Sequence, residues 1–312
     1  RAGTGSVIEM NGVRVTGTVN TTGTGSFRAN GSINNVLSGV TLNGNLDMAS
    51  LAASTRISEG LVLNGAIDVG GSSILYLDNR STPNQTISGT GSIHLAGGAL
   101  RMEGTGQTTT GANITIRGSG TVGQATLLSG QHTWIHNGLV SADVSGQTLN
   151  LVNPGNGSQP VQNNGTMQAA GGGTLQIGTD VVGGAGSRYD VDAASRILMN
   201  GVTLSGVVNQ TGTGAIDTSA SFSNLFSATS LSGRVNVSSL RVSNGMAMNG
   251  GATVNVGPSS VLYFDNRTGV GAAAAQTLSG NGQIMMTGGA MRFEGGTSTT
   301  WDSGITEIGR AH

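Results

Sequence analysis

The stretch Val40-Thr-Leu-Asn-Gly-Asn-Leu-Asp-Met48 returns further along the chain as Leu61-Val-Leu-Asn-Gly-Ala-Ile-Asp-Val69. Each copy alternates apolar and polar residues, breaks at a glycine and then alternates again. Alternation with period two predicts a β-strand with one buried face. Glycine weakens a strand unless it marks a corner or a close backbone approach. A glycine that recurs at the same point therefore predicts a strand, a corner and a second strand in each short unit.

The short units recur about every 20–27 residues along the chain, a period typical of solenoid repeats. Short strands with glycine corners at this period predict an all-β fold, a right-handed parallel β-helix (β-solenoid) in which each unit is one coil. Stacking at the strand spacing of ~4.8 Å predicts about 13–15 coils. The alternative is an antiparallel sandwich or barrel, which is also rich in short strands and turns. Those folds do not usually repeat a glycine inside each strand pair, so the solenoid is favoured.

A longer repeat lies over the short one. Met10-Asn-Gly-Val13 returns as Met199-Asn-Gly-Val202, and Leu75-Tyr-Leu-Asp-Asn-Arg80 returns at nearly the same offset as Leu262-Tyr-Phe-Asp-Asn-Arg267. We expect a chain with no cap pattern at either end to be a fragment or a subunit that stacks on neighbours. The predicted organisation is one solenoid over residues 1–312, with a long unit at about 6–120, intervening coils at about 121–190 and an incomplete second long unit at about 195–312.

Composition excludes several classes of protein. Glycine provides 55 of the 312 residues, but Val, Ile, Leu and Met recur throughout, unlike in a disordered chain. Only 9% of the residues are charged and the net charge is −1, so the chain lacks the positive charge that nucleic-acid binding requires. The absence of cysteine excludes disulfides and thiol chemistry. No apolar run approaches ~18 residues, so we expect no membrane-spanning helix.

Several segments resemble the coils of secreted bacterial surface proteins. They include Ile116-Arg-Gly-Ser-Gly-Thr-Val-Gly123 and Asn164-Gly-Thr-Met-Gln-Ala-Ala-Gly-Gly-Gly-Thr-Leu175. The resemblance is to autotransporter passengers and filamentous-haemagglutinin-like exoproteins. It implies a β-helical stalk, extracellular or at the bacterial cell surface, that serves adhesion or a matrix. It carries over no catalytic residue, metal or cofactor. The predicted function is a non-enzymatic rod that associates with itself or with host or matrix glycans.

The segment Gln131-His132-Thr133-Trp134-Ile135-His136 is the most unusual in composition. On a strand, two histidines four residues apart are separated by ~13 Å, too far to share a metal ion. We expect His132, Trp134 and His136 to form one outward stripe, with Thr133 and Ile135 pointing inward. Such a stripe predicts contact with a glycan or a partner protein. The alternative is that Trp134 covers a junction between the long units.

The doubled Leu-Tyr-[Leu/Phe]-Asp-Asn-Arg motif supplies two further candidates, Tyr76 and Tyr263. The flanking apolar residues should point inward, which places the tyrosine and Asp78 on the outside. An exposed tyrosine beside an aspartate could stack on a sugar ring. The alternative is a structural turn in which Asp-Asn hydrogen-bonds its own backbone.

Two charged patterns complete the candidates. Arg101 and Glu103 should share a strand face, as should their repeats Arg292 and Glu294; this predicts a surface ion pair worth ~0–1 kcal/mol or a spot for an anionic sugar.

The pair Asp190 and Asp192 has a strand separation of ~6.5–7 Å, which is compatible with glycoside hydrolysis. It supports one alternative function, a polysaccharide-degrading β-helix protein, whereas the alternative of a polysaccharide-binding protein rests on Trp134.

Overall fold

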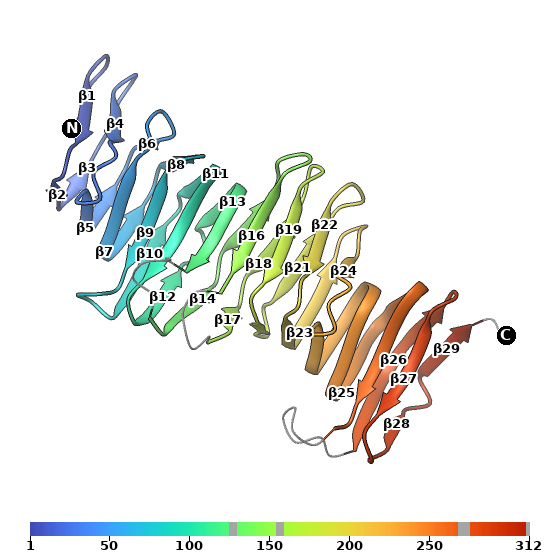
Figure 1. The fold of residues 1–312 in the computed structure, drawn as a ribbon. Helices are drawn as coiled ribbons and strands as arrows, with labels where there is room; N and C mark the ends of the chain where they lie inside the picture. The colour runs from blue at the N-terminus through green and yellow to red at the C-terminus, as the bar shows by residue number, and fades with distance from the viewer. Residues whose placement is uncertain (125–129, 154–158, 268–274, 310–312) are drawn as a thin grey trace.

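The computed structural model describes residues 1–124, 130–153, 159–267 and 275–309. Over these residues the chain is a β-solenoid of about 12 turns without a helix, so the predicted all-β solenoid is confirmed. Figure 1 shows the coils side by side in a rod, with the N-terminus at one end and the C-terminus at the other. The turns are fewer than predicted because some coils are longer than the predicted period. The coil that pairs Val7 with Ser26 is short, whereas the coil that pairs Met246 with Leu278 is much longer.

The strands all join one sheet with parallel pairing in the described residues. In chain order they are β1 (Val7–Met10), β2 (Arg14–Val15), β3 (Thr18–Val19), β4 (Ser26–Ala29), β5 (Val36–Leu42), β6 (Leu46–Met48), β7 (Ser54–Leu63), β8 (Ala66–Gly70), β9 (Ile74–Asp78), β10 (Asn84–Gly89), β11 (Ser92–Glu103), β12 (Gly106–Thr110), β13 (Thr115–Gln124), β14 (His132–His136), β15 (Leu139–Ala142), β16 (Thr148–Val152), β17 (Val161–Asn163), β18 (Thr166–Ala169), β19 (Thr174–Gly178), β20 (Val181–Gly183), β21 (Arg188–Val191), β22 (Arg196–Met199), β23 (Thr203–Thr211), β24 (Ile216–Thr218), β25 (Leu225–Asp265), β26 (Gln276–Met286), β27 (Ala290–Glu294), β28 (Thr299–Trp301) and β29 (Ile305–Gly309).

Successive coils stack their strands into three faces. Face 1 contains β1, β4, β6, β8, β15, β18 and β21. Face 2 contains β9, β16, β19, β22 and β24. Face 3 contains β10, β12, β14, β17 and β20. The longer strands β5, β7, β11, β13, β23 and β25 bend from one face to another, and β11 pairs with both β8 and β9.

The predicted alternation fills a narrow core between the faces. Leu42, Leu63 and Ile67 are fully buried, as the strand pattern requires. The predicted corners are also present, because Gly44 and Gly65 stack so closely that a Cβ on Gly65 would collide with the Gly44 carbonyl. Only glycine fits a corner of this kind.

The second long unit is turned by one face relative to the first. The stretch ending at Met10 forms β1 on face 1, but its repeat ending at Met199 forms β22 on face 2. Likewise β4 lies on face 1, whereas the equivalent β24 lies on face 2. The intervening coils therefore separate the two units by whole turns and a part of one.

Candidate functional site

The predicted outward stripe on β14 is inside the protein. His132, Trp134 and His136 are 1%, 1% and 0% exposed, whereas Thr133 and Ile135 are partly exposed. The prediction that the three rings form a surface is wrong. Sequence alternation alone does not decide which side chains of β14 face the core. One set contains the aliphatic Ile135, and the other contains the three rings. Burial favours the larger apolar surface of tryptophan inside.

Two buried threonines of the preceding coil explain how the polar rings are accommodated. The Thr108 hydroxyl lies 3.0 Å from His132 Nε2, and the Thr110 hydroxyl lies 3.1 Å from His136 Nδ1. Trp134 Nε1 donates to the same Thr110 hydroxyl at 3.3 Å. Burial disfavours the charged imidazolium and lowers the pKa of both histidines to about 4. Both rings are therefore neutral at pH 7.

The two tyrosines point away from the core as predicted, but neither presents an open ring. The guanidinium of Arg56 lies over the Tyr76 ring at 4.7 Å from its centroid. Tyr263 is only 4% exposed, because Arg241 covers one side at 4.6 Å and the exposed Phe222 ring packs edge-on at 6.2 Å. The prediction that Tyr263 exposes its ring is therefore wrong.

The aspartate of the first motif belongs to a buried ion network rather than to the surface. Asp78 is 8% exposed and Glu103, one coil later, is 2% exposed. Arg56, from the coil before, reaches both carboxylates, at 3.3 Å for Asp78 and in a shorter contact with Glu103. Arg80 closes the network with a 2.5 Å contact to Asp78. Burial raises the pKa of Asp78, but the hydrogen bonds from Arg80 and Arg56 outweigh it, and the net pKa is below the ordinary value.

The second long unit repeats this network contact for contact. Arg241 contacts Asp265 at 2.7 Å and Glu294 at 2.6 Å, and Arg267 contacts Asp265 at 2.7 Å. The hydrogen bonds of Arg267 lower the pKa of Asp265. The predicted surface pairing of Arg292 with Glu294 is wrong in its partner, because Glu294 is held by Arg241 and Arg267.

The first unit requires the same correction: Glu103 is buried rather than at the surface, and the arginines paired with it there are Arg56 and Arg80. Sequence reasoning missed Arg56 and Arg241. The signal was present, since Arg56-Ile-Ser58 and Arg241-Val-Ser243 occupy equivalent places in the two long units.

Asp190 lies on β21 and Asp192 lies just beyond its end, and both carboxylates bond to neighbouring coils. Asp190 accepts hydrogen bonds from Gln168 at 3.0 Å and from the Thr211 hydroxyl at 2.8 Å. Asp192 accepts from the backbone N–H groups of Gly171 at 2.8 Å and Ala194 at 3.0 Å. The structure thus gives both carboxylates a structural role between neighbouring coils.

A surface groove lies where β7 bends in the first unit. Glu59 and Gly60 form the bend, with φ of 62° and 88°, in the left-handed region that non-glycine residues seldom adopt. The groove, about 390 Å³ in volume, is lined by this bend and by residues of β5, β10 and β12 that include Gln85, Thr86 and Ser88. We call it the first groove.

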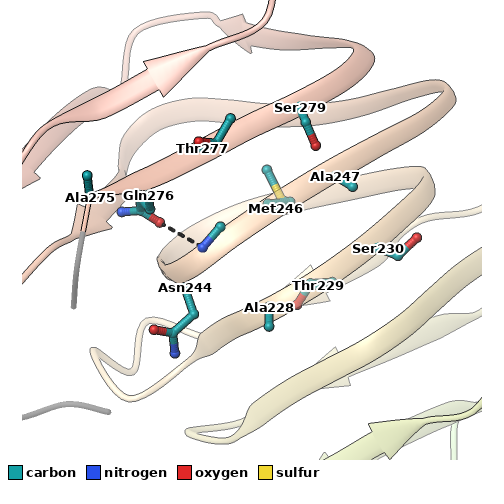
Figure 2. Close-up of a pocket in the computed structure, with 11 residues that line it drawn as sticks. Ala228, Thr229, Ser230, Asn244, Met246, Ala247, Ala275, Gln276, Thr277 and Ser279 are labelled. Atoms are coloured by element: carbon teal, nitrogen blue, oxygen red, sulfur yellow. Dashed lines mark hydrogen bonds between the residues drawn. The ribbon is translucent and has the colours of Figure 1, made fainter. Parts of the chain in front are cut away.

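The second groove occupies the equivalent place in the second unit and measures about 560 Å³. Its bend is Asn244 and Gly245, with φ of 57° and 85°. Figure 2 shows Asn244 at this bend, and Gly245 N–H donates to the Gln276 side chain at 3.4 Å. Thr277 and Ser279 line the same groove, as their counterparts line the first. The duplication therefore produced two matching grooves, which sequence reasoning missed because neither contains an aromatic or catalytic signature.

Comparisons with protein-family models, with curated proteins and with solved structures found no match. Among the described residues, no helix is long and apolar enough to cross a membrane.

Removal of one cation from the buried network tests its contribution to stability. We expect Arg56→Ala to lower the free energy of unfolding by about 3–5 kcal/mol, because two buried carboxylates lose a partner. The matched control is Arg28→Ala, which removes the exposed pair with Glu9 and should cost about 1 kcal/mol or less. Urea unfolding followed by circular dichroism measures both. Equal losses would contradict the network's role.

The buried histidines predict a specific pH dependence. An unfolded histidine binds its proton near pH 6.5, whereas His132 and His136 in the folded protein bind theirs only near pH 4. The free energy of unfolding is therefore highest above pH 6.5 and decreases as the pH falls toward 4. The loss should approach about 3 kcal/mol for each histidine. Urea unfolding between pH 7.5 and 4.5 should show this slope in wild type and a much flatter one in the His132→Gln/His136→Gln double variant.

The control for this slope is Ile135→Gln, a partly exposed position on the same strand that adds no titrating group. It should shift stability by a constant amount at every pH. A double variant that keeps the wild-type slope would show that the histidines do not cause it.

Proposed function

We propose that the protein is a non-enzymatic structural rod of a bacterial surface or extracellular matrix, which presents binding regions along its length and associates with further copies. The observation that carries this proposal is one continuous core through about 12 turns. In such a stack, each coil is stabilised by its neighbours, so stiffness extends over the whole length.

Polar ladders on the outside support a mechanical role. Asn43 Nδ2 donates to Asn20 at 2.9 Å, and Asn64 Nδ2 donates to Asn43 at 2.8 Å, so the side chains of successive coils are joined. A similar bond joins Asn164 to Asn137 at 3.0 Å. Asparagine ladders of this kind reinforce stacked parallel strands. The sequence resemblance to secreted surface proteins supports the proposed location.

Negative-stain electron microscopy across a concentration series tests the proposal. We expect rigid rods about 58 Å long at low concentration, from about 12 turns at ~4.8 Å each. At high concentration, we expect fibres or bundles built from these rods. Compact particles would contradict the rod, and separate rods at every concentration would remove self-association from the proposal.

A further inference from the structure

We infer that the first and second grooves are two binding sites for neutral, hydroxyl-rich glycan chains, and that the rod cross-links two such chains. The two grooves have the same bend, the same threonine and serine positions and volumes of about 390 and 560 Å³. These volumes fall in the ~300–1,000 Å³ range of ligand sites. This ligand role adds to the proposed mechanical role and does not require the rods to associate with each other.

The lining matches a neutral polyol. Thr86 and Ser88 in the first groove, and Ser279 in the second, have hydroxyls that make no side-chain hydrogen bond within the described residues. Such hydroxyls can both donate to and accept from sugar hydroxyls. Val62, 38% exposed, and Ala247 add small apolar patches for the C–H face of a sugar ring.

Charge argues against an ionic ligand. Among the residues that the structure describes, Glu59 is the one charged residue that lines the first groove, and Arg14 lies 3.8 Å from its carboxylate. The equivalent residue in the second groove is the uncharged Asn244, whose side chain donates to Ser227 at 3.0 Å. Binding common to both grooves therefore depends on hydroxyl and amide groups rather than on net charge.

The backbone argues against an added peptide strand. Strand addition requires an open sheet edge with unpaired N–H and C=O groups. In the first groove, β10 is paired on both sides, with β7 and β12. In the second, β26 is paired with β25 and β28. Side chains, not main-chain hydrogen bonds, are the groups that these grooves offer.

Geometry separates the two sites. The second groove lies about eight coils beyond the first, or about 40 Å at the strand spacing. This count follows the strand pairing from β7 through β10, β12, β14, β17, β20 and β23 to β25. Because the second unit is turned by one face, the grooves lie on different edges of the rod. A straight chain that occupies one groove does not lie along the other, so two sites engage two chains.

The test uses beads coated with neutral linear polysaccharides: dextran, pullulan, a β-1,4-mannan and a β-1,4-galactan. Ser88→Arg and Ser279→Arg each fill one groove from an outward strand position. The matched control is Gln176→Arg, a partly exposed position on β19 outside both grooves, whose side chain makes no hydrogen bond among the described residues. Binding to the beads and agglutination of the beads are measured separately, at protein concentrations at which electron microscopy shows separate rods.

We expect wild type and Gln176→Arg to bind and to agglutinate beads of at least one coating. Each single groove variant should still bind but should need at least tenfold more protein to agglutinate. The double variant should do neither, while its circular dichroism and unfolding midpoint match those of the control. Titration with a trisaccharide of the bound polymer should give two sites in wild type and one in each single variant.

Four results would overturn the inference. The first is no binding to any of the four coatings, and the second is binding that survives in the double variant. The third is undiminished agglutination by the single variants, which would show that rods associating with each other join the beads. The fourth is loss of rod association in the double variant without loss of bead binding, which would identify a second copy of the chain as the occupant and would exclude the glycan.

Discussion

In-register stacking of parallel coils is the constraint on which every other feature of this structure depends. Each coil forms its main-chain hydrogen bonds with the coil before and the coil after, so side chains at equal positions meet at the strand spacing. This spacing is close enough to require glycine at corners such as Gly65. It also brings Arg56, Asp78 and Glu103 together from successive coils, although they lie far apart in the sequence.

Stacking of this kind makes interactions local along the rod, and this explains how the second unit tolerates a different orientation. The network of Arg241, Asp265 and Glu294 needs only the few coils that contain it. A copied unit can therefore be turned by one face without loss of its own contacts, provided that the junction coils continue the strands. Because of the same turn, the two matching grooves lie on different edges of the rod and open toward different sides.

Much of the fold could be predicted from sequence because it depends on composition and period. Alternation around Leu42 and Leu63, with the glycine that follows, predicts two strands of each coil and the corner between them. The direction of the β14 side chains could not be predicted, because alternation does not say which set faces inward. Trp134 is buried because its apolar surface is large, and Thr110 one coil away accepts its indole N–H. The grooves could not be predicted either, since they depend on left-handed φ at Glu59 and Asn244.

Disulfide trapping between neighbouring coils tests in-register stacking, and the chain suits this experiment because it contains no cysteine of its own. The registers pair Val62 with Ser88 and Ala247 with Ser279. Paired Cα atoms at ~4.8 Å permit a disulfide, whereas a partner shifted by two residues lies beyond about 7 Å. We expect near-complete oxidation of Val62→Cys/Ser88→Cys and of Ala247→Cys/Ser279→Cys, and little oxidation of Val62→Cys/Thr86→Cys. Equal oxidation of the shifted pair, or failure in one unit only, would contradict the in-register stack and its duplication.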